Sequence, residues 1–151
     1  MESKKQLLLL PLGGIFTALP LILPRLGAFE WVAMIPALLW LFSKVTPQKR
    51  PKLRHLYGAG ALYFLGFYLT VFHWFFYLYP MEFAGVTRLE AAVLVLICWL
   101  GLSLLQTVFS ALIFPLFGLL CHTRVMRRFP ILTPFLFAAQ YTVAEWGQTF
   151  T

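Results

Sequence analysis

Two ionisable side chains, His73 and Glu145, stand within long apolar stretches of this sequence, as does the carboxamide of Gln106. A polar or ionisable group in a hydrocarbon environment is costly, so such residues are candidates for function. Both ionisable residues also have an ordinary interpretation. Glu145 lies near the end of its apolar stretch, where charge is tolerated, and a histidine among aromatic residues is more often a packing residue than a ligand.

The sequence offers no recognisable catalytic or metal-binding set beyond these residues. It has three histidines, two cysteines and no aspartate, and the histidines do not cluster with other ligand types. A zinc site needs several such ligands at close spacing. There is also no glycine-rich phosphate loop and no Ser-His-Asp set. We therefore predict no catalytic residue, no metal and no cofactor.

Polar and small residues recur at helical spacing in three of the apolar stretches, which places each set on one helix face. The simplest interpretation is that helices are held together along these stripes, because small and polar residues commonly form such interfaces in membranes. The alternative is a cavity or lipid portal, for which the candidates are His73, Trp74, Tyr77, Gln106 and Glu145. The stripes are Tyr63, Gly66, Thr70, His73 and Tyr77; Trp99, Ser103, Gln106 and Ser110; and Tyr141, Glu145 and Gln148.

Cys98 and Cys121 carry little signal. A nucleophilic cysteine needs a nearby base or a lowered pKa, and neither residue has such a setting in the sequence. A disulfide needs closely spaced Cα atoms and an oxidising compartment, which nothing indicates. We interpret both as small buried thiols.

The amino-acid composition indicates which class of protein this chain belongs to. The chain has 151 residues, of which 61% are hydrophobic and 11% charged, against about 25% charged in a soluble domain. The net charge of +7 does not indicate nucleic-acid binding, because the basic residues lie in short segments between apolar runs. This is the pattern of cytoplasmic loops in membrane proteins.

The pattern predicts an all-α membrane protein with five transmembrane helices in a single domain covering residues 1–151. The second span is short for a hydrocarbon core of about 30 Å, and Pro115 is expected to kink the fourth. The sequence shows no internal repeat and no linker between domains. The expected spans are residues 7–24, 28–42, 56–79, 91–120 and 134–151.

The distribution of basic residues predicts the orientation. Ten of them lie in the N-terminal segment, the loop 43–55 and the segment 121–133, whereas Arg25 and Arg88 are alone on the other side. All these loops are short, which is the regime in which positively charged loops remain in the cytoplasm. The N-terminus is therefore expected inside and the C-terminus outside.

Several stretches resemble the membrane part of apolipoprotein N-acyltransferases. In that family a glycine-bearing first span is followed by a Trp-containing second span, a basic loop, an aromatic third span and a fifth span that ends in Glu-Trp. Their order and spacing carry the resemblance over nearly the whole chain. The matching stretches are 31–39, 58–66, 73–77, 83–85, and Pro134 to Glu145-Trp146, with 149–151 resembling the approach to a Thr-Gly-Phe-Pro-Trp loop. Family members commonly have Asn at the position of His73.

The resemblance implies an enzyme of the bacterial inner membrane that transfers an acyl chain from a phospholipid to the N-terminal cysteine of a diacylated lipoprotein through a thioester. It also implies eight spans and an outer nitrilase-like domain with a Glu-Lys-Cys catalytic set, none of which can be placed on this sequence. The chain resembles the first third of such an enzyme, which supplies anchoring and part of a lipid portal, and is predicted to be inactive alone. The alternatives are a free-standing small membrane protein, such as a transporter or an assembly subunit, and a different membrane-embedded enzyme using His73, Gln106 and Glu145.

Overall fold

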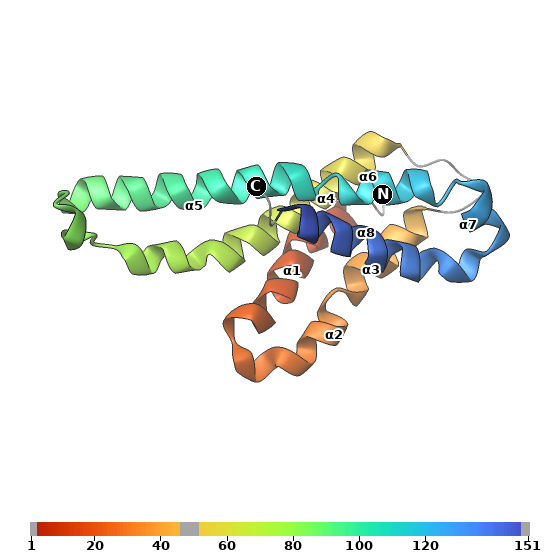
Figure 1. Cartoon of the computed structure of the whole chain (residues 1–151), viewed down its shortest axis with the longest axis horizontal. Coiled ribbons are helices and arrows are strands. Elements are labelled where there is room, and N and C mark those ends of the chain that lie inside the picture. The colour runs from red at the N-terminus through yellow and green to blue at the C-terminus, as the bar shows by residue number, and fades with distance from the viewer. Residues whose placement is uncertain (1–2, 46–51, 149–151) are drawn as a thin grey trace.

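The computed structural model describes residues 3–45 and 52–148, and over these ranges every regular element is helical (Figure 1). This agrees with the predicted all-α class. Lys49 and Arg50, two of the basic residues used for the orientation, lie outside the described residues, as do Thr149 to Thr151.

Two helical runs are long and apolar enough to cross a bilayer. The first joins α4 (Leu53–Val71) to the 3₁₀ turn η2 (Phe72–Leu78), and the second joins α5 (Arg88–Ser110) to α6 (Ile113–Leu120). Only 22% and 17% of their most apolar stretches are buried. The core helix of a soluble protein would be mostly buried, and these two runs are not.

The other expected spans are shorter helices. Here α1 covers Ser3–Ile22, and the second expected span is divided into α2 (Glu30–Ala33) and α3 (Ile35–Lys44). The last is α8 (Thr133–Gln148). Among the described residues, the two long runs alone pass the length and apolarity test, so the structure supports two spans directly and the number five stays a prediction.

The long pair ends in a tight hairpin. Met81 and Gly85 both adopt positive φ, of 57° and 67°, which reverses the chain after η2. The first turn of α5 is then closed by a capping box in which Thr87 accepts from the Glu90 amide and the Glu90 carboxylate accepts from the Thr87 amide. These bonds satisfy amides that have no partner within the helix. Figure 1 shows this distal hairpin, residues 72–97, extending well beyond the other helices.

Pro115 accounts for the break between α5 and α6. Proline has no backbone N–H, so it cannot donate to the carbonyl of Ala111, four residues earlier. The helix is interrupted at Ala111 and Leu112, one turn before the proline. This interruption agrees with the disturbance expected from Pro115 near the end of this run, and Gly60 of α4 packs directly against the interrupted turn.

Helices α1 and α4 cross at glycines. A Cβ added at Gly14 would overlap the Tyr63 carbonyl, and one added at Gly66 would overlap the carbonyl of Pro11. The two backbones therefore touch without intervening side chains, as small residues permit in membrane helices. After α1 the chain turns through η1 (Pro24–Phe29) into α2 and α3, which return toward α4 (Figure 1).

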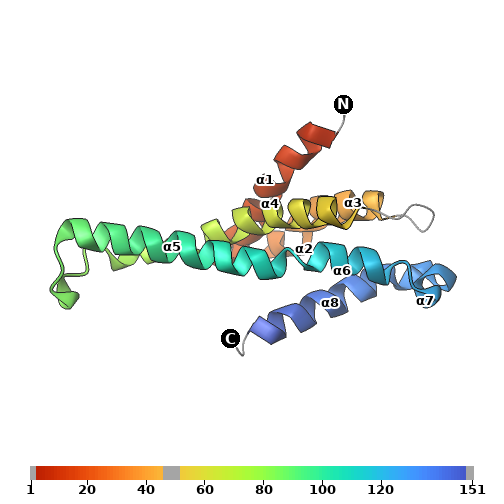
Figure 2. The same cartoon turned by 90° about the horizontal axis from the view of Figure 1, so that it is seen from above.

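The core is aromatic and lies where α4, α6, α3 and α8 meet. Phe114 of α6 contacts the rings of Trp40, Tyr63 and Phe64. One turn later, Phe117 contacts Phe42 and Phe137. Figure 2 shows α8 and the start of α1 on opposite sides of the long helices. The chain reaches α8 through α7 (Arg124–Arg128) and η4 (Pro130–Leu132).

Candidate functional site

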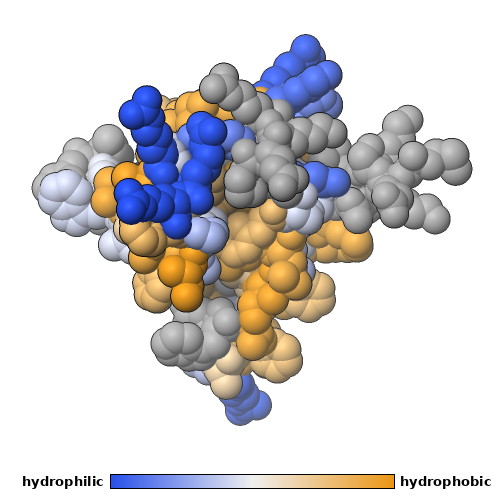
Figure 3. All heavy atoms as spheres, turned by 90° about the vertical axis from the view of Figure 1, so that its right-hand side faces the viewer, coloured by the Kyte–Doolittle hydropathy of each residue, from blue (hydrophilic) through white to orange (hydrophobic). Residues whose placement is uncertain are grey.

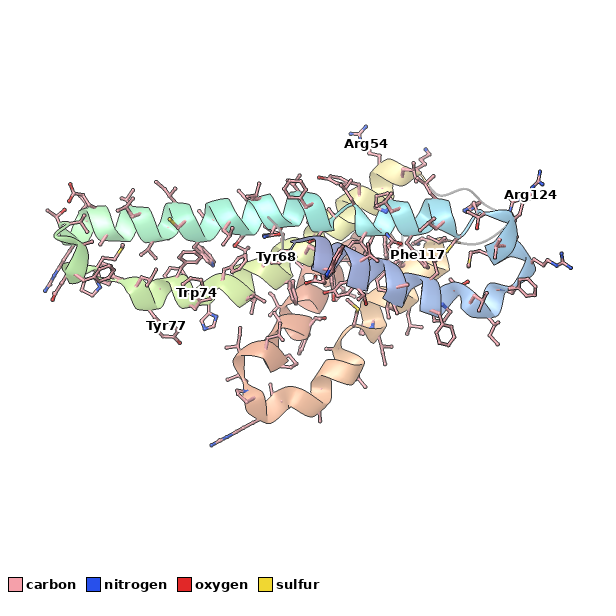
Figure 4. All side chains as sticks on the ribbon, viewed as in Figure 1. Arg54, Tyr68, Trp74, Tyr77, Phe117 and Arg124 are labelled. Atoms are coloured by element: carbon pink, nitrogen blue, oxygen red, sulfur yellow. The ribbon has the colours of Figure 1, made fainter. Side chains whose placement is uncertain are left out.

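Three of the five portal candidates lie together on the distal hairpin. His73, Trp74 and Tyr77 all belong to η2, where the ring of His73 packs edge-on against Tyr77 with centroids 5.7 Å apart. The Nδ1 atom of His73 lies 2.9 Å from the carbonyl of Thr70. Tyr77 is 79% exposed, and Figure 4 shows Trp74 and Tyr77 far along the hairpin from Tyr68. This group is thus an exposed aromatic surface.

The residues of the stripe expected along 63–77 do not all lie on one face of the helix. Tyr63 donates to or accepts from Thr17 of α1 at 2.7 Å, whereas Tyr68, outside the stripe, pairs with Ser110 of α5 at 2.7 Å. From Phe72 the chain is a 3₁₀ turn, whose three residues per turn rotate later side chains away from the face of α4. The α-helical spacing assumed across Phe72 was wrong for this reason, and Tyr77 does not share the surroundings of Tyr63.

The stripe on α5 is divided as well. Trp99 donates its indole N–H to the Leu69 carbonyl at 3.0 Å, and Ser103 and Ser110 are buried. Trp99 and Ser110 join α5 to α4, as expected for helices held by polar contacts, whereas Ser103 bonds the Trp99 carbonyl of its own helix. Gln106 instead lies on the side of α5 that faces α8.

Gln106 forms part of the wall of an open groove. The groove has a volume of about 650 Å³ and lies between α5–α6 and α8. This is within the range of small-molecule sites. Its walls are almost entirely apolar, with Leu105 and Phe109 on one side, Val143 and Ala144 on the other, and carboxamides of Gln106 and Gln140.

Gln140 holds the two walls of this groove together. Its amide nitrogen donates to the Ile113 carbonyl of α6 at 2.8 Å. Its amide oxygen is buried with no hydrogen-bond partner among the described residues. The sequence analysis missed this residue, although a glutamine within an apolar span carries the same signal as Gln106.

Glu145 lies on α8 one turn after Tyr141, close enough for its carboxylate to interact electrostatically with the Tyr141 hydroxyl. Tyr141 packs against the aromatic core, close enough to Tyr63 and Tyr68 for their hydroxyls to interact electrostatically with its own. Glu145 itself is half-buried. Of the partners considered for its carboxylate, the Tyr141 hydroxyl is the one that lies near it. His73 is bonded to the Thr70 carbonyl of its own helical run.

The pair gives a direct test of the role of Glu145. Glu145→Gln is expected to lower the free energy of unfolding by on the order of 1–3 kcal/mol if the carboxylate bonds the partly buried Tyr141 hydroxyl beside it, because the substitution removes the charged acceptor. Tyr141→Phe should have a similar effect, and the double variant should cost less than the sum. Unfolding in mixed micelles measures all three.

Glu82→Gln, at an exposed site on the distal hairpin, is the matched control and should be neutral. If Glu145→Gln melts like the wild type and shows no coupling to Tyr141→Phe, then Glu145 only reaches the interface.

Neither cysteine is placed for nucleophilic chemistry. Cys98 is exposed on α5 and Cys121 is buried at the end of α6. Burial raises the pKa of the Cys121 thiol to about 11, so the reactive thiolate is scarce at neutral pH. Within residues 3–45 and 52–148, no three histidine, cysteine or glutamate side chains gather as a metal ion would require.

Comparisons with known proteins do not identify the site. No family model, curated protein or solved structure matches the chain.

Proposed function

We propose that the chain is a five-span membrane protein of the bacterial inner membrane, with its N-terminus in the cytoplasm. Support comes from the two long runs, which leave most of their apolar surface exposed. It also comes from the glycine crossing of α1 on α4, a contact that suits helices in lipid. The helices α1, α2–α3 and α8 would supply the remaining spans.

We further propose that the chain forms the N-terminal, membrane-embedded part of an apolipoprotein N-acyltransferase. In this proposal it anchors the enzyme and contributes a lateral portal for the acyl chain of a phospholipid. The observation that carries the portal is the open, apolar groove between α5–α6 and α8. An acyl chain fits such walls, and the carboxamide of Gln106 supplies a donor for a lipid ester oxygen.

The chemistry itself would belong to the Glu-Lys-Cys set of a nitrilase-like domain. The described part of the chain gives that reaction no activated thiol, because Cys98 faces outward on α5 and Cys121 is buried. The sequence resemblance and the groove together favour the acyltransferase over a small transporter.

The proposal is tested in two steps. First, the reading frame that follows codon 151 should encode a nitrilase-like domain, and a stop codon with no such domain nearby would contradict the proposal. Second, Val143→Trp in that full-length enzyme should greatly reduce lipoprotein acylation, because the indole would fill the groove. Val143 is exposed in the groove wall, so the change spares the core.

Ala138→Trp is the matched control, since Ala138 is exposed on another face of α8, outside the groove. Equal activity of the two variants would remove the groove from the lipid path. The isolated 151-residue chain is expected to transfer no acyl group. An acyl thioester trapped on Cys98 or Cys121 would contradict the assignment of the chemistry to a separate nitrilase-like domain.

A further inference from the structure

The connection between α6 and α8 is a structured elbow, residues 122–135. Its first turn is held by Arg127, whose guanidinium donates twice to the His122 carbonyl, at 3.1 and 2.8 Å. The helix α7 follows, and Thr133 starts α8 after the short η4. The elbow therefore presents its side chains from a fixed backbone.

Three arginines and no carboxylate lie on this elbow. Arg124, Arg127 and Arg128 are all exposed, and none forms an ion pair with the residues that the structure describes. Arg128 lies over the ring of Phe129, 5.7 Å from its centroid. The exposed acids Glu82 and Glu90 belong to the hairpin at the opposite end of the molecule (Figure 1). The positive charge of the elbow is thus uncompensated within the described chain.

Large apolar side chains are exposed between and after the arginines. Val125, Phe129 and Ile131 are 56%, 50% and 78% exposed, and Phe135 is 71% exposed. Figure 3 looks onto this end of the molecule and shows strongly hydrophilic side chains beside an apolar surface. In Figure 4, Arg124 points away from the bundle.

Cations and apolar groups presented together match the interface of a membrane. There the apolar side chains enter the acyl region while the arginines reach the phosphates. A soluble acidic partner would match the arginines but would leave these apolar side chains in water. The combination of positive charge and exposed apolar surface therefore favours a lipid over a soluble acidic partner.

We propose that the elbow binds the headgroups of anionic phospholipids in the leaflet that borders this end of the protein. Arg124 and Arg128 contact the phosphates, and Val125, Phe129 and Ile131 insert beside the acyl chains. Arg127 holds the turn. This binding depends on the chain lying in a bilayer and is independent of the acyltransferase assignment.

The test measures lipid binding to the purified 151-residue chain. Native mass spectrometry in detergent counts bound dioleoyl phosphatidylglycerol against dioleoyl phosphatidylcholine over a lipid titration. The wild type is expected to prefer phosphatidylglycerol. The double variant Arg124→Gln/Arg128→Gln should reduce that preference by about 25-fold, at roughly fivefold for each arginine.

The double variant Arg25→Gln/Arg88→Gln is the matched control. It removes the same charge from exposed residues away from the elbow, and it should keep the wild-type preference. Equal losses in the two variants would show attraction to net charge alone and would overturn the proposal.

Two further measurements separate the lipid from other anions. Val125→Ser/Ile131→Ser should weaken phosphatidylglycerol binding with all arginines present, because the acyl contact is lost. Excess inorganic phosphate or a polyglutamate peptide should not displace the lipid. Displacement by either, or full binding by the serine variant, would show a simple anion site and contradict the proposal.

Discussion

Gly66→Ala is expected to destabilise the protein strongly, although it adds only one methyl group. The new Cβ would overlap the carbonyl of Pro11, a backbone atom that no side-chain rotation can move away. Helices α1 and α4 would have to separate along their whole contact. We expect a loss of about 3 kcal/mol or more in the free energy of unfolding, the upper part of the range for overpacked sites.

Gly58→Ala is the matched control because Gly58 lies on the same helix with nothing near its added Cβ. Alanine is the better helix former, so this variant should be more stable by roughly 0.5–1 kcal/mol. Unfolding in mixed micelles compares the two. If Gly66→Ala were as stable as Gly58→Ala, the backbone contact between α1 and α4 would not exist.

Phe114→Ala is expected to have the next largest effect, a loss of about 3–5 kcal/mol. Phe114 is 1% exposed, and its ring touches three other aromatic rings from α3 and α4. The cavity left by its removal would lie within the aromatic core, between α3, α4 and α6. The contact energy is lost even in lipid, since it is a matter of packing rather than of water.

The same measurement on Phe83→Ala provides the comparison. Phe83 is 80% exposed on the distal hairpin, so its removal leaves no cavity and should change stability little. Equal losses at the two positions would show that Phe114 is not part of a packed core.

The sequence was sufficient to predict the two long helical runs, although both begin three residues earlier than expected, at Leu53 and Arg88. Apolar runs free of acid predicted the helical class, and Pro115 predicted the break near Ala111 because a missing backbone N–H is a local property. The division of the second expected span at Met34 was not foreseen. Pro36 lies in the first turn of α3, where proline is tolerated. Its position in the sequence could have indicated that a new helix begins there.

The candidate site was harder to predict because it depends on which faces meet. Helical spacing placed Gln106 and Ser110 on one stripe. In the structure, however, Ser110 bonds Tyr68 of α4, whereas Gln106 lines the groove beside α8. Residue spacing does not reveal where an α-helix changes to a 3₁₀ turn. For this reason the stripe along residues 63–77 was extended too far into η2. The contact of Gln140 with the Ile113 carbonyl depends on the docking of α8, which no local pattern shows.

The interruption at Ala111 and Leu112 divides the longest helical run into two parts with different neighbours. On one side, α5 packs along α4 and η2, and on the other, α6 carries Phe114 and Phe117 into the core. A helix bends most easily where its hydrogen-bond ladder is already broken. Displacement of the hairpin tip by a partner or by the bilayer would therefore turn about this joint. The aromatic core around α6 would stay fixed, while Leu105 and Phe109 on the α5 side of the joint would swing relative to α8 and change the width of the groove.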